Sequence, residues 1–234
     1  MRLYIIRHAD PDYERGTITP DGHLEAQALA DRLMEHGLDR IYCSPMGRAI
    51  HTMQYTTDRL RMQAIIVDWM QEINGMNVTV GEWGSMSPFE LPGEVILEKE
   101  PFPGHHNWHE NPFLSDGRLQ AKVKEIQESS DAFLSSLGYE REGGRYRCVR
   151  PNEEQVAVFC HGGLGLTWLA HLLQLPTSLA WSAFWLAPSS VTTILMDRRS
   201  DEWAVPRCIG LGDTSHLHKA GLPIKPRGIL ANYY

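Results

Sequence analysis

The chain has 234 residues, 42% of them hydrophobic, and is therefore long enough to bury a large core. Its formal net charge of −7 argues against a nucleic-acid partner and against an acidic membrane surface. No apolar segment approaches the roughly 20 residues of a membrane span, and no signal peptide is recognisable at the start. These features predict a cytoplasmic protein that folds as a single α/β domain over residues 1–234.

The first ten residues contain a short apolar run that predicts a strand. Residues 3–6 read Leu-Tyr-Ile-Ile, which is typical of a strand buried on both faces of a sheet. Arg7 and His8 follow directly, at the carboxyl end of this strand, where open α/β sheets hold their ligands. A helix is predicted next, between an N-cap at Thr19 and a stop at Gly37.

Two further strands carry polar residues toward the same edge. Residues 40–44 form the next apolar run, and the helix that follows it carries Arg48 in its first turn. Residues 64–67 form a third strand, and Glu72 lies a few residues beyond its end. Each strand is thus followed closely by a side chain that can bind or protonate a ligand.

The segment at about 73–117 has no clear periodicity and is rich in glycine, proline and aromatic residues. A stretch this long inside a compact domain predicts an inserted functional lid, and a surface excursion without function is the alternative. It contains seven acidic residues and one basic residue, Lys99. Its acids and rings favour a leaving group that is apolar, stackable or cationic, unless the rings only anchor the segment to the core. The candidate lid and substrate residues in it are Glu82, Trp83, His105, His106, Trp108 and His109.

The opening pattern returns in the second half of the chain. A helix from about residue 118 and a hairpin over residues 139–149 precede another apolar strand at residues 156–160. That strand ends at His161, and two glycines lead into a helix. The remaining predicted strands cover residues 191–196 and 203–209. The whole pattern predicts a three-layer α/β/α sandwich around a mostly parallel, doubly wound sheet.

Five candidate site residues follow the carboxyl ends of predicted strands: Arg7, His8, Arg48, Glu72 and His161. In a doubly wound sheet these ends share one edge, so we expect the five side chains in one pocket. Two guanidinium groups can hold the oxygens of one phosphoryl group through charge-assisted hydrogen bonds. The glycines after His161 leave helix N–H groups free for the same anion.

This set of side chains suits a two-step phosphoryl transfer. Neutral His8 would attack phosphorus in line, while the arginines neutralise charge on the equatorial oxygens. Glu72 would protonate the leaving oxygen and then deprotonate the incoming water. Nearby arginines lower the pKa of a carboxyl group, so desolvation has to offset them if Glu72 is to act as an acid.

Five sequence blocks, in order, resemble the histidine phosphatase (phosphoglycerate mutase-like) superfamily. They are Arg7-His8-Ala9-Asp10, Thr19-Pro-x-Gly22-x-x-Glu25-Ala26, Ser44-Pro-x-x-Arg48-Ala49, Met70-Gln-Glu72 and His161-Gly162-Gly163. The resemblance implies a phosphoglycerate mutase-like fold, with His8 as the phosphorylated nucleophile and Glu72 as the proton donor. It implies that Arg7, Arg48 and His161 form the phosphate pocket, with His161 also in the catalytic set. The implied activity is hydrolysis of a small-molecule phosphomonoester without a metal or another cofactor.

Three positions depart from the pattern of that family. Ala9 replaces the usual glycine beside the nucleophile, which mildly restricts the backbone. Glu14 stands where many members place a phosphate-contacting asparagine, so either its carboxylate turns away or that contact is lost. A glycine motif that includes Glu82 lies further downstream than usual, which leaves Glu82 as an alternative to Glu72 for the acid.

Two other activities share this set of residues. A phosphoglycerate mutase-type phosphotransferase would keep a bisphosphorylated intermediate, which requires extra basic residues around the entrance. The acidic segment 73–117 does not supply them, and the long mutase signature is absent, so a phosphatase fits better. A non-enzymatic module that binds phosphorylated ligands is the second alternative, although binding alone does not require an acid such as Glu72.

Other chemistries fit the sequence less well. The four cysteines are scattered, and neither Cys43 nor Cys160 has the arginine spacing of a thiol phosphatase loop. His105, His106 and His109 could bind zinc, but no fourth ligand is evident beside them. The sequence does not decide between a monomer and a homodimer.

Overall fold

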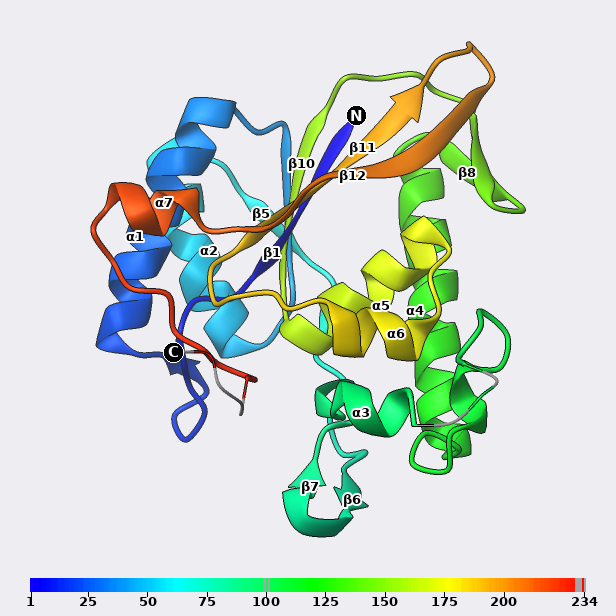
Figure 1. Ribbon diagram of the computed structural model, residues 1–234. Coiled ribbons are helices and arrows are strands. Elements are labelled where there is room, and N and C mark those ends of the chain that lie inside the picture. The colour runs from blue at the N-terminus through cyan, green and yellow to red at the C-terminus, as the bar shows by residue number, and fades with distance from the viewer. Residues whose placement is uncertain (99, 101, 230–232, 234) are drawn as a thin grey trace.

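Strand β1 (Arg2–Arg7) lies inside an eight-stranded sheet, as its apolar sequence predicts (Figure 1). The computed structural model describes residues 1–98, 100, 102–229 and 233, and of Glu82 only the backbone. The other strands of this sheet are β4 (Arg40–Cys43), β5 (Ala64–Ile66), β8 (Tyr139–Glu142), β9 (Arg145–Cys148), β10 (Gln155–Cys160), β11 (Val191–Arg198) and β12 (Trp203–Asp213). Their order across the sheet is β5-β4-β10-β1-β11-β12-β9-β8.

The sheet is mixed, and its two halves differ in strand direction. Strands β5, β4, β10 and β1 pair in parallel, whereas β11, β12, β9 and β8 continue from β1 in antiparallel order. The parallel half is the part from which the sequence predicts the candidate site. Because β1, β4 and β10 run in the same direction, their carboxyl ends meet at one edge of the sheet.

Alternate residues of β1 belong to two separate hydrophobic cores, which explains its unbroken apolar sequence. Leu3 and Ile5 pack on one face of the sheet, and Tyr4 and Ile6 pack on the other. Helices α1 (Pro20–His36) and α2 (Gly47–Leu60) contribute to the core that contains Ile6. Helices α4 (Gly117–Ser136) and α5 (Gly162–Leu173) contribute to the other core. The three-layer α/β/α prediction is therefore confirmed (Figure 1).

Several predicted helix ends and turns are present at the expected residues. The Thr19 hydroxyl accepts a hydrogen bond from the Gly22 N–H at 3.0 Å and so caps α1. Gly37 ends the same helix with a φ of 71°, a backbone conformation that favours glycine. The β8–β9 hairpin turns at Gly143 and Gly144, between Glu142 and Arg145.

The segment 73–117 contains only short elements, consistent with its lack of periodicity. They are β6 (Val78–Val80), η2 (Gly81–Trp83), β7 (Gly84–Met86), η3 (Pro88–Glu90), α3 (Gly93–Ile96) and η4 (Trp108–Glu110). This segment extends beyond the sheet below helices α5 and α6 (Thr177–Ala183) (Figure 1). Its description as a lid inserted into one domain stays a prediction.

The remaining elements are small. They are β2 (Pro11–Asp12), β3 (Thr17–Ile18), η1 (Asp68–Met70) and α7 (Ser215–Lys219). The sequence analysis predicted neither α6 nor α7, nor the short pairing of β2 with β3. Within the described residues, no helix has both the length and the apolar character to cross a membrane.

Candidate active site

His8 lies just beyond β1, almost completely buried, with an exposed fraction of 2%. Its Nδ1 lies 2.8 Å from the carbonyl oxygen of Ala9. A carbonyl oxygen only accepts hydrogen bonds, so Nδ1 must carry the proton and donate. The neutral ring therefore has its lone pair on Nε2.

His161 follows β10 in the same way and lies beside His8. The two ring centroids are 5.2 Å apart, and the His161 side chain is fully buried. Its Nε2 is 2.8 Å from the hydroxyl oxygen of Ser44, which follows β4. The two imidazoles predicted from the ends of distant strands are thus brought together.

Two buried guanidinium groups complete this part of the site. Arg7 donates from Nη1 to the carbonyl oxygens of Leu186, at 2.5 Å, and Arg227, at 3.1 Å. Arg48 lies in the first turn of α2, with its guanidinium carbon 5.6 Å from the centre of the Tyr13 ring. Within the part of the chain that the structure describes, three buried nitrogen atoms here have no hydrogen-bond partner: Arg7 Nε, Arg48 Nε and His161 Nδ1.

Burial and positive charge keep both imidazoles neutral. Burial lowers the pKa of His8 well below its ordinary value of 6.5, and the neighbouring charges of Arg7 and Arg48 lower it further. The pKa of His161 is also well below 6.5, first because of burial and then because of His8 and the two arginines. An uncharged ring with a free lone pair is the form that can act as a nucleophile.

Glu72 approaches the same site from the loop that follows η1. Its carboxyl oxygens accept hydrogen bonds from the N–H groups of Gly163, at 3.0 Å, and Leu164, at 2.8 Å. These N–H groups belong to the first turn of α5, which begins directly after His161. Burial raises the pKa of Glu72 above 4.5, although the backbone hydrogen bonds and Arg48 act in the opposite direction. Desolvation therefore offsets the arginines, as an acid at this position requires.

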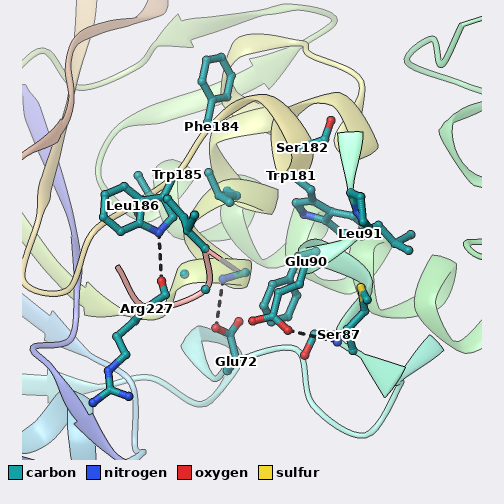
Figure 2. A pocket seen from close by; sticks show the side chains of 18 of the residues that line it. Glu72, Ser87, Glu90, Leu91, Trp181, Ser182, Phe184, Trp185, Leu186 and Arg227 are labelled. Atoms are coloured by element: carbon teal, nitrogen blue, oxygen red, sulfur yellow. Dashed lines mark hydrogen bonds between the residues drawn. The ribbon is translucent and has the colours of Figure 1, made fainter. Parts of the chain in front are cut away.

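A cavity of about 630 Å³ opens above these residues (Figure 2). Arg7, Arg48 and Glu72 line its inner end, and the buried His8 and His161, whose pKa values both arginines lower, are not themselves among the lining residues. We call the rest of the cavity the outer chamber. Its principal lining residues are Trp83, Phe89, Glu90, Glu94, Trp181 and Trp185. The cavity therefore joins a cationic inner end to an aromatic and acidic outer part.

The outer chamber is in direct contact with the inner end through Phe89. A Cβ atom added at Gly163 would overlap the Phe89 ring, so this ring lies directly against the first turn of α5. Gly163 also donates its N–H to Glu72. Phe89 thus packs beside the peptide that holds the acid and helps to keep water away from it.

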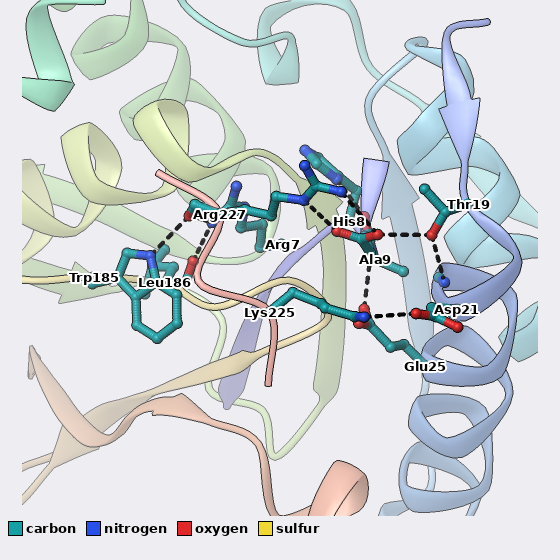
Figure 3. A network of polar contacts seen from close by, with 12 residues as sticks. Arg7, His8, Ala9, Thr19, Asp21, Glu25, Trp185, Leu186, Lys225 and Arg227 are labelled. Atoms are coloured by element: carbon teal, nitrogen blue, oxygen red, sulfur yellow. Dashed lines mark hydrogen bonds and ion pairs between the residues drawn. The ribbon is translucent and has the colours of Figure 1, made fainter. Parts of the chain in front are cut away.

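The C-terminal segment, residues 225–229, contributes residues 227–229 to the cavity lining, and Figure 3 shows the polar contacts of Arg227. The Arg227 guanidinium donates to both carboxyl oxygens of Asp10, from Nε at 2.6 Å and from Nη2 at 3.2 Å. The Arg227 carbonyl oxygen accepts hydrogen bonds from Arg7 and from Trp185 Nε1, the latter at 3.0 Å. One residue thus connects the strand that carries His8 with the wall of the outer chamber.

The acids beneath this segment have opposite pKa shifts. Burial alone would raise the pKa of Asp10, but the hydrogen bonds from Arg227 and Thr19 outweigh it and lower the pKa. Glu25 accepts a hydrogen bond from the Asp10 N–H at 2.9 Å, and burial raises its pKa to about 7. Asp10 is therefore the charged partner of Arg227.

Several predicted lid and substrate residues lie outside the cavity. Glu14 is exposed and is not among the described lining residues. Of the candidates in segment 73–117, Trp83 lines the outer chamber, and the side chain of Glu82 lies outside the description. The four that do not line it are His105, His106, Trp108 and His109. Trp108 is buried with its ring 5.6 Å from that of Trp181, which fits the alternative that such rings anchor the segment.

The thiol and metal alternatives gain no support. Burial raises the pKa of Cys43 to about 12 and that of Cys160 above its ordinary value, so both thiols stay protonated and unreactive. Among the described residues, no three His, Cys, Asp or Glu side chains are grouped closely enough to hold a metal ion.

Three contributors to the cavity did not emerge from the sequence: Arg227, Trp181 and Trp185. The tail around Arg227 has little periodicity, and its arginine resembles any surface arginine in the sequence. The high density of aromatic residues at positions 181–185, Trp-Ser-Ala-Phe-Trp, is the sequence feature that could have indicated Trp181 and Trp185.

The fold and the site together define a phosphoglycerate mutase-like α/β protein. Residues 3–208 match the histidine phosphatase superfamily (branch 1). The chain belongs to the histidine phosphatase superfamily.

The chain is similar in sequence to two curated proteins and in fold to several solved structures. The chain is 28% identical over 145 residues to a provisionally named phosphoserine phosphatase 2 from Hydrogenobacter thermophilus, and 25% identical over 146 residues to phosphoserine phosphatase 1 of that organism. These matches cover 58% of this chain and only 66% and 64% of the relatives. A phosphoserine phosphatase from Entamoeba histolytica, crystallised with phosphoserine, has a TM-score of 0.61 at 21% identity and covers 92% of this chain and 98% of its own. A mycobacterial glucosyl-3-phosphoglycerate phosphatase has a TM-score of 0.54 at 17% identity and covers 90% and 98%.

Proposed function

We propose that this protein is a phosphomonoester phosphatase that works through a phosphohistidine on His8. The observation that carries the proposal is the group of three buried, unpartnered nitrogen atoms around an oriented, neutral imidazole. Buried polar groups are nearly always hydrogen-bonded, so these atoms are expected to bind a ligand rich in acceptor oxygens. A tetrahedral phosphoryl group supplies such oxygens, and two guanidinium groups compensate its charge.

In the first step, the lone pair of His8 Nε2 attacks phosphorus, and the bond between phosphorus and the leaving oxygen breaks. The proton of the Glu72 carboxyl group passes to that oxygen, so the product leaves as a neutral alcohol. Arg7 and Arg48 stabilise the charge that develops on the equatorial oxygens. The hydrogen bond from Nδ1 to Ala9 stabilises the positive charge that the ring gains.

In the second step, water takes the place of the alcohol in the cavity. The Glu72 carboxylate accepts a proton from this water as the new oxygen–phosphorus bond forms and the phosphorus–nitrogen bond breaks. Inorganic phosphate leaves, and His8 returns to the neutral form with Glu72 protonated. The cycle balances without a metal ion or another cofactor.

Arg227 acts as a positioning residue in this scheme. Arg7 needs a fixed orientation to present Nε to the phosphoryl group, and two carbonyl oxygens hold its Nη1. One of these oxygens belongs to Arg227, whose own guanidinium is held by the buried Asp10. The two ends of the described chain are thus coupled at the phosphate site.

The charge of the cavity favours a phosphatase over a mutase. A mutase retains an intermediate with two phosphoryl groups, and the second group requires basic residues beyond the inner end. Among the described lining residues, Arg227 is the one cation other than Arg7 and Arg48, and Asp10 engages its guanidinium. Glu90 and Glu94 would repel a second phosphoryl group.

The test is a single-turnover and steady-state assay with p-nitrophenyl phosphate. The wild type should form nitrophenol and an alkali-stable, acid-labile protein adduct with the mass of one phosphoryl group. His8→Ala should lose both the adduct and at least about a thousandfold in kcat. His218→Ala, which replaces an exposed histidine outside the cavity, should retain both. Turnover by His8→Ala at the wild-type rate would disprove the proposal.

A further inference from the structure

The outer chamber has flat apolar walls that are fixed by hydrogen bonds. Trp181 donates from Nε1 to the hydroxyl of Thr167 at 2.9 Å, which ties it to helix α5. Trp185 is held by its hydrogen bond to the Arg227 carbonyl oxygen. Phe89 lies against Gly163. Rings fixed in this way can stack on a ligand with little loss of conformational entropy.

The charges of the outer chamber are negative. Glu90 and Glu94 line it, and both residues are exposed. Oxygen Oε1 of Glu90 faces the C-terminal segment, 3.8 Å from the position of a Cβ atom added at Gly228. Arg7 and Arg48 lie at the inner end, and Arg227 is engaged by Asp10. A carboxylate on the substrate would therefore lose water without gaining a described cation as a partner.

The outer chamber differs in its charge from a site that would select phosphoserine or phosphoglycerate. Those substrates carry a carboxylate close to the phosphoryl group, and a site that selects them has to pair this second anion. Here the space next to the inner end is bordered by Phe89, Trp181 and two acids. The aromatic walls complement a ring on the alcohol part of the substrate, and the acids complement a positive charge on it.

We infer that the substrate is an aryl or similarly ring-bearing phosphomonoester without an anionic group on its alcohol, and that an amino group on that alcohol improves binding. This inference rests on the proposed phosphatase activity. It assigns Phe89, Trp181 and Trp185 to stacking on the alcohol, and Glu90 and Glu94 to selecting its charge. The inner end holds the phosphoryl group of any phosphomonoester, so specificity arises in the outer chamber.

Four phenolic substrates with the same ring and nearly the same leaving oxygen test the inference. They are 4-ethylphenyl phosphate, tyramine phosphate, phosphotyrosine and 3-(4-phosphooxyphenyl)propionate. Among these four phenolic substrates, the wild type should have the lowest kcat/KM for the propionate, about tenfold below the neutral ethyl compound. Tyramine phosphate should exceed the ethyl compound by about threefold, the size expected for solvent-exposed charges. Phosphoserine and 3-phosphoglycerate should be poorer than all four.

Variants at the acids identify the source of the discrimination. In Glu90→Gln combined with Glu94→Gln, the ratio of kcat/KM for tyramine phosphate over the propionate should fall by about tenfold. The matched control is Glu110→Gln, which removes one charge from the same segment but does not line the cavity, and should leave this ratio unchanged.

The outcomes separate the two proposals. If p-nitrophenyl phosphate and all four phenolic substrates resist hydrolysis, the phosphatase assignment itself fails. If they are hydrolysed but phosphoserine, 3-phosphoglycerate or the propionate is preferred, the phosphatase assignment stands and the inferred substrate class is wrong. Equal rates for the four phenolic substrates would also overturn it.

Discussion

The inner end of the cavity and the outer chamber are built in different ways. The inner end consists of side chains that follow the strands and helices of the parallel half-sheet, such as His8 after β1 and His161 after β10. The outer chamber combines three regions that are distant in sequence: residues 83–94, helix α6 and the residues just after it, and the C-terminal segment. The comparison teaches that the sheet positions the residues for phosphoryl transfer, whereas packing between irregular segments determines which alcohol groups of the substrate fit.

The largest expected effect comes from removing the acid at the inner end. The Gly163 and Leu164 N–H groups donate to different carboxyl oxygens of Glu72, so the amide oxygen of Glu72→Gln can replace only one of these acceptors, and the amide cannot supply a proton. We expect kcat for phenyl phosphate to fall by about a hundredfold or more. With p-nitrophenyl phosphate, whose alcohol leaves without a proton, a burst of nitrophenol should precede slow turnover. A uniform loss without a burst would remove Glu72 from the second step.

The pH dependence of kcat should come from the inner end. His8 must be neutral, and its pKa lies below 6.5, so activity is retained as the pH falls until the pH drops through this lowered pKa. Glu72 must be protonated, and its pKa lies above 4.5, so activity is lost as the pH rises through this raised pKa. A profile of kcat for phenyl phosphate should show both limbs.

The variant Glu72→Gln tests whether Glu72 is the group that causes the alkaline limb of this pH profile. Glu72→Gln should lack this limb, because the amide does not titrate, and should retain the acidic limb of His8. An alkaline limb that is unchanged in Glu72→Gln would show that another group is the acid, with Glu82 as the alternative raised by the sequence.

A smaller effect is expected where the two parts of the cavity are joined. Arg227→Ala removes the partner of the buried Asp10 carboxylate, which should lower the free energy of unfolding by about 1–2 kcal/mol. We expect kcat/KM to fall by about tenfold, mainly through KM, because Arg7 loses its fixed orientation. Chemical denaturation and steady-state kinetics measure the two effects.

A double variant distinguishes positioning from a purely structural role of Arg227. Asp10→Asn alone should have a similar kinetic effect, and the combination with Arg227→Ala should be clearly less than additive. Additive losses in kcat/KM would show that the two residues act independently of their ion pair.

The smallest effect is expected at Glu14. Its side chain is exposed and does not line the cavity, so Glu14→Gln should change kcat/KM for p-nitrophenyl phosphate by less than about twofold. Measuring kcat/KM of the wild type and of Glu14→Gln at low and high salt isolates any long-range repulsion between the Glu14 carboxylate and the phosphate of the substrate. An increase of more than about tenfold would mean that the loop around Glu14 closes over the phosphate site during turnover.

The inner end could be predicted from the sequence because its spacing follows from sheet geometry. Arg7, His8 and His161 come directly after apolar strands, and strand ends in a parallel half-sheet converge by construction. Glu72 is harder, since it lies beyond a 3-10 turn and is placed by hydrogen bonds to helix α5. The sequence placed Glu72 a few residues beyond the third predicted strand, but no local pattern indicates the hydrogen bonds that fix its orientation.

The outer chamber could not be predicted in this way, for a physical reason. The indole N–H of Trp181 donates to the Thr167 hydroxyl, which holds its ring in the cavity wall. Arg227 lies at the site because its guanidinium donates to the buried Asp10 carboxylate. Such contacts join residues that no local pattern relates. The rings of segment 73–117 illustrate the limit, since Trp83 lines the chamber and Trp108 packs into the core.

The central place of β1 also has a consequence for how the protein acquires its structure. This strand pairs with β10, about 150 positions later, and with β11, still further along the chain. Such distant pairings have a high contact order, so loop closure has to precede most of the stabilising contacts, and folding is correspondingly slow. We therefore expect His8 and His161 to come together late in folding, after most of the polypeptide has collapsed.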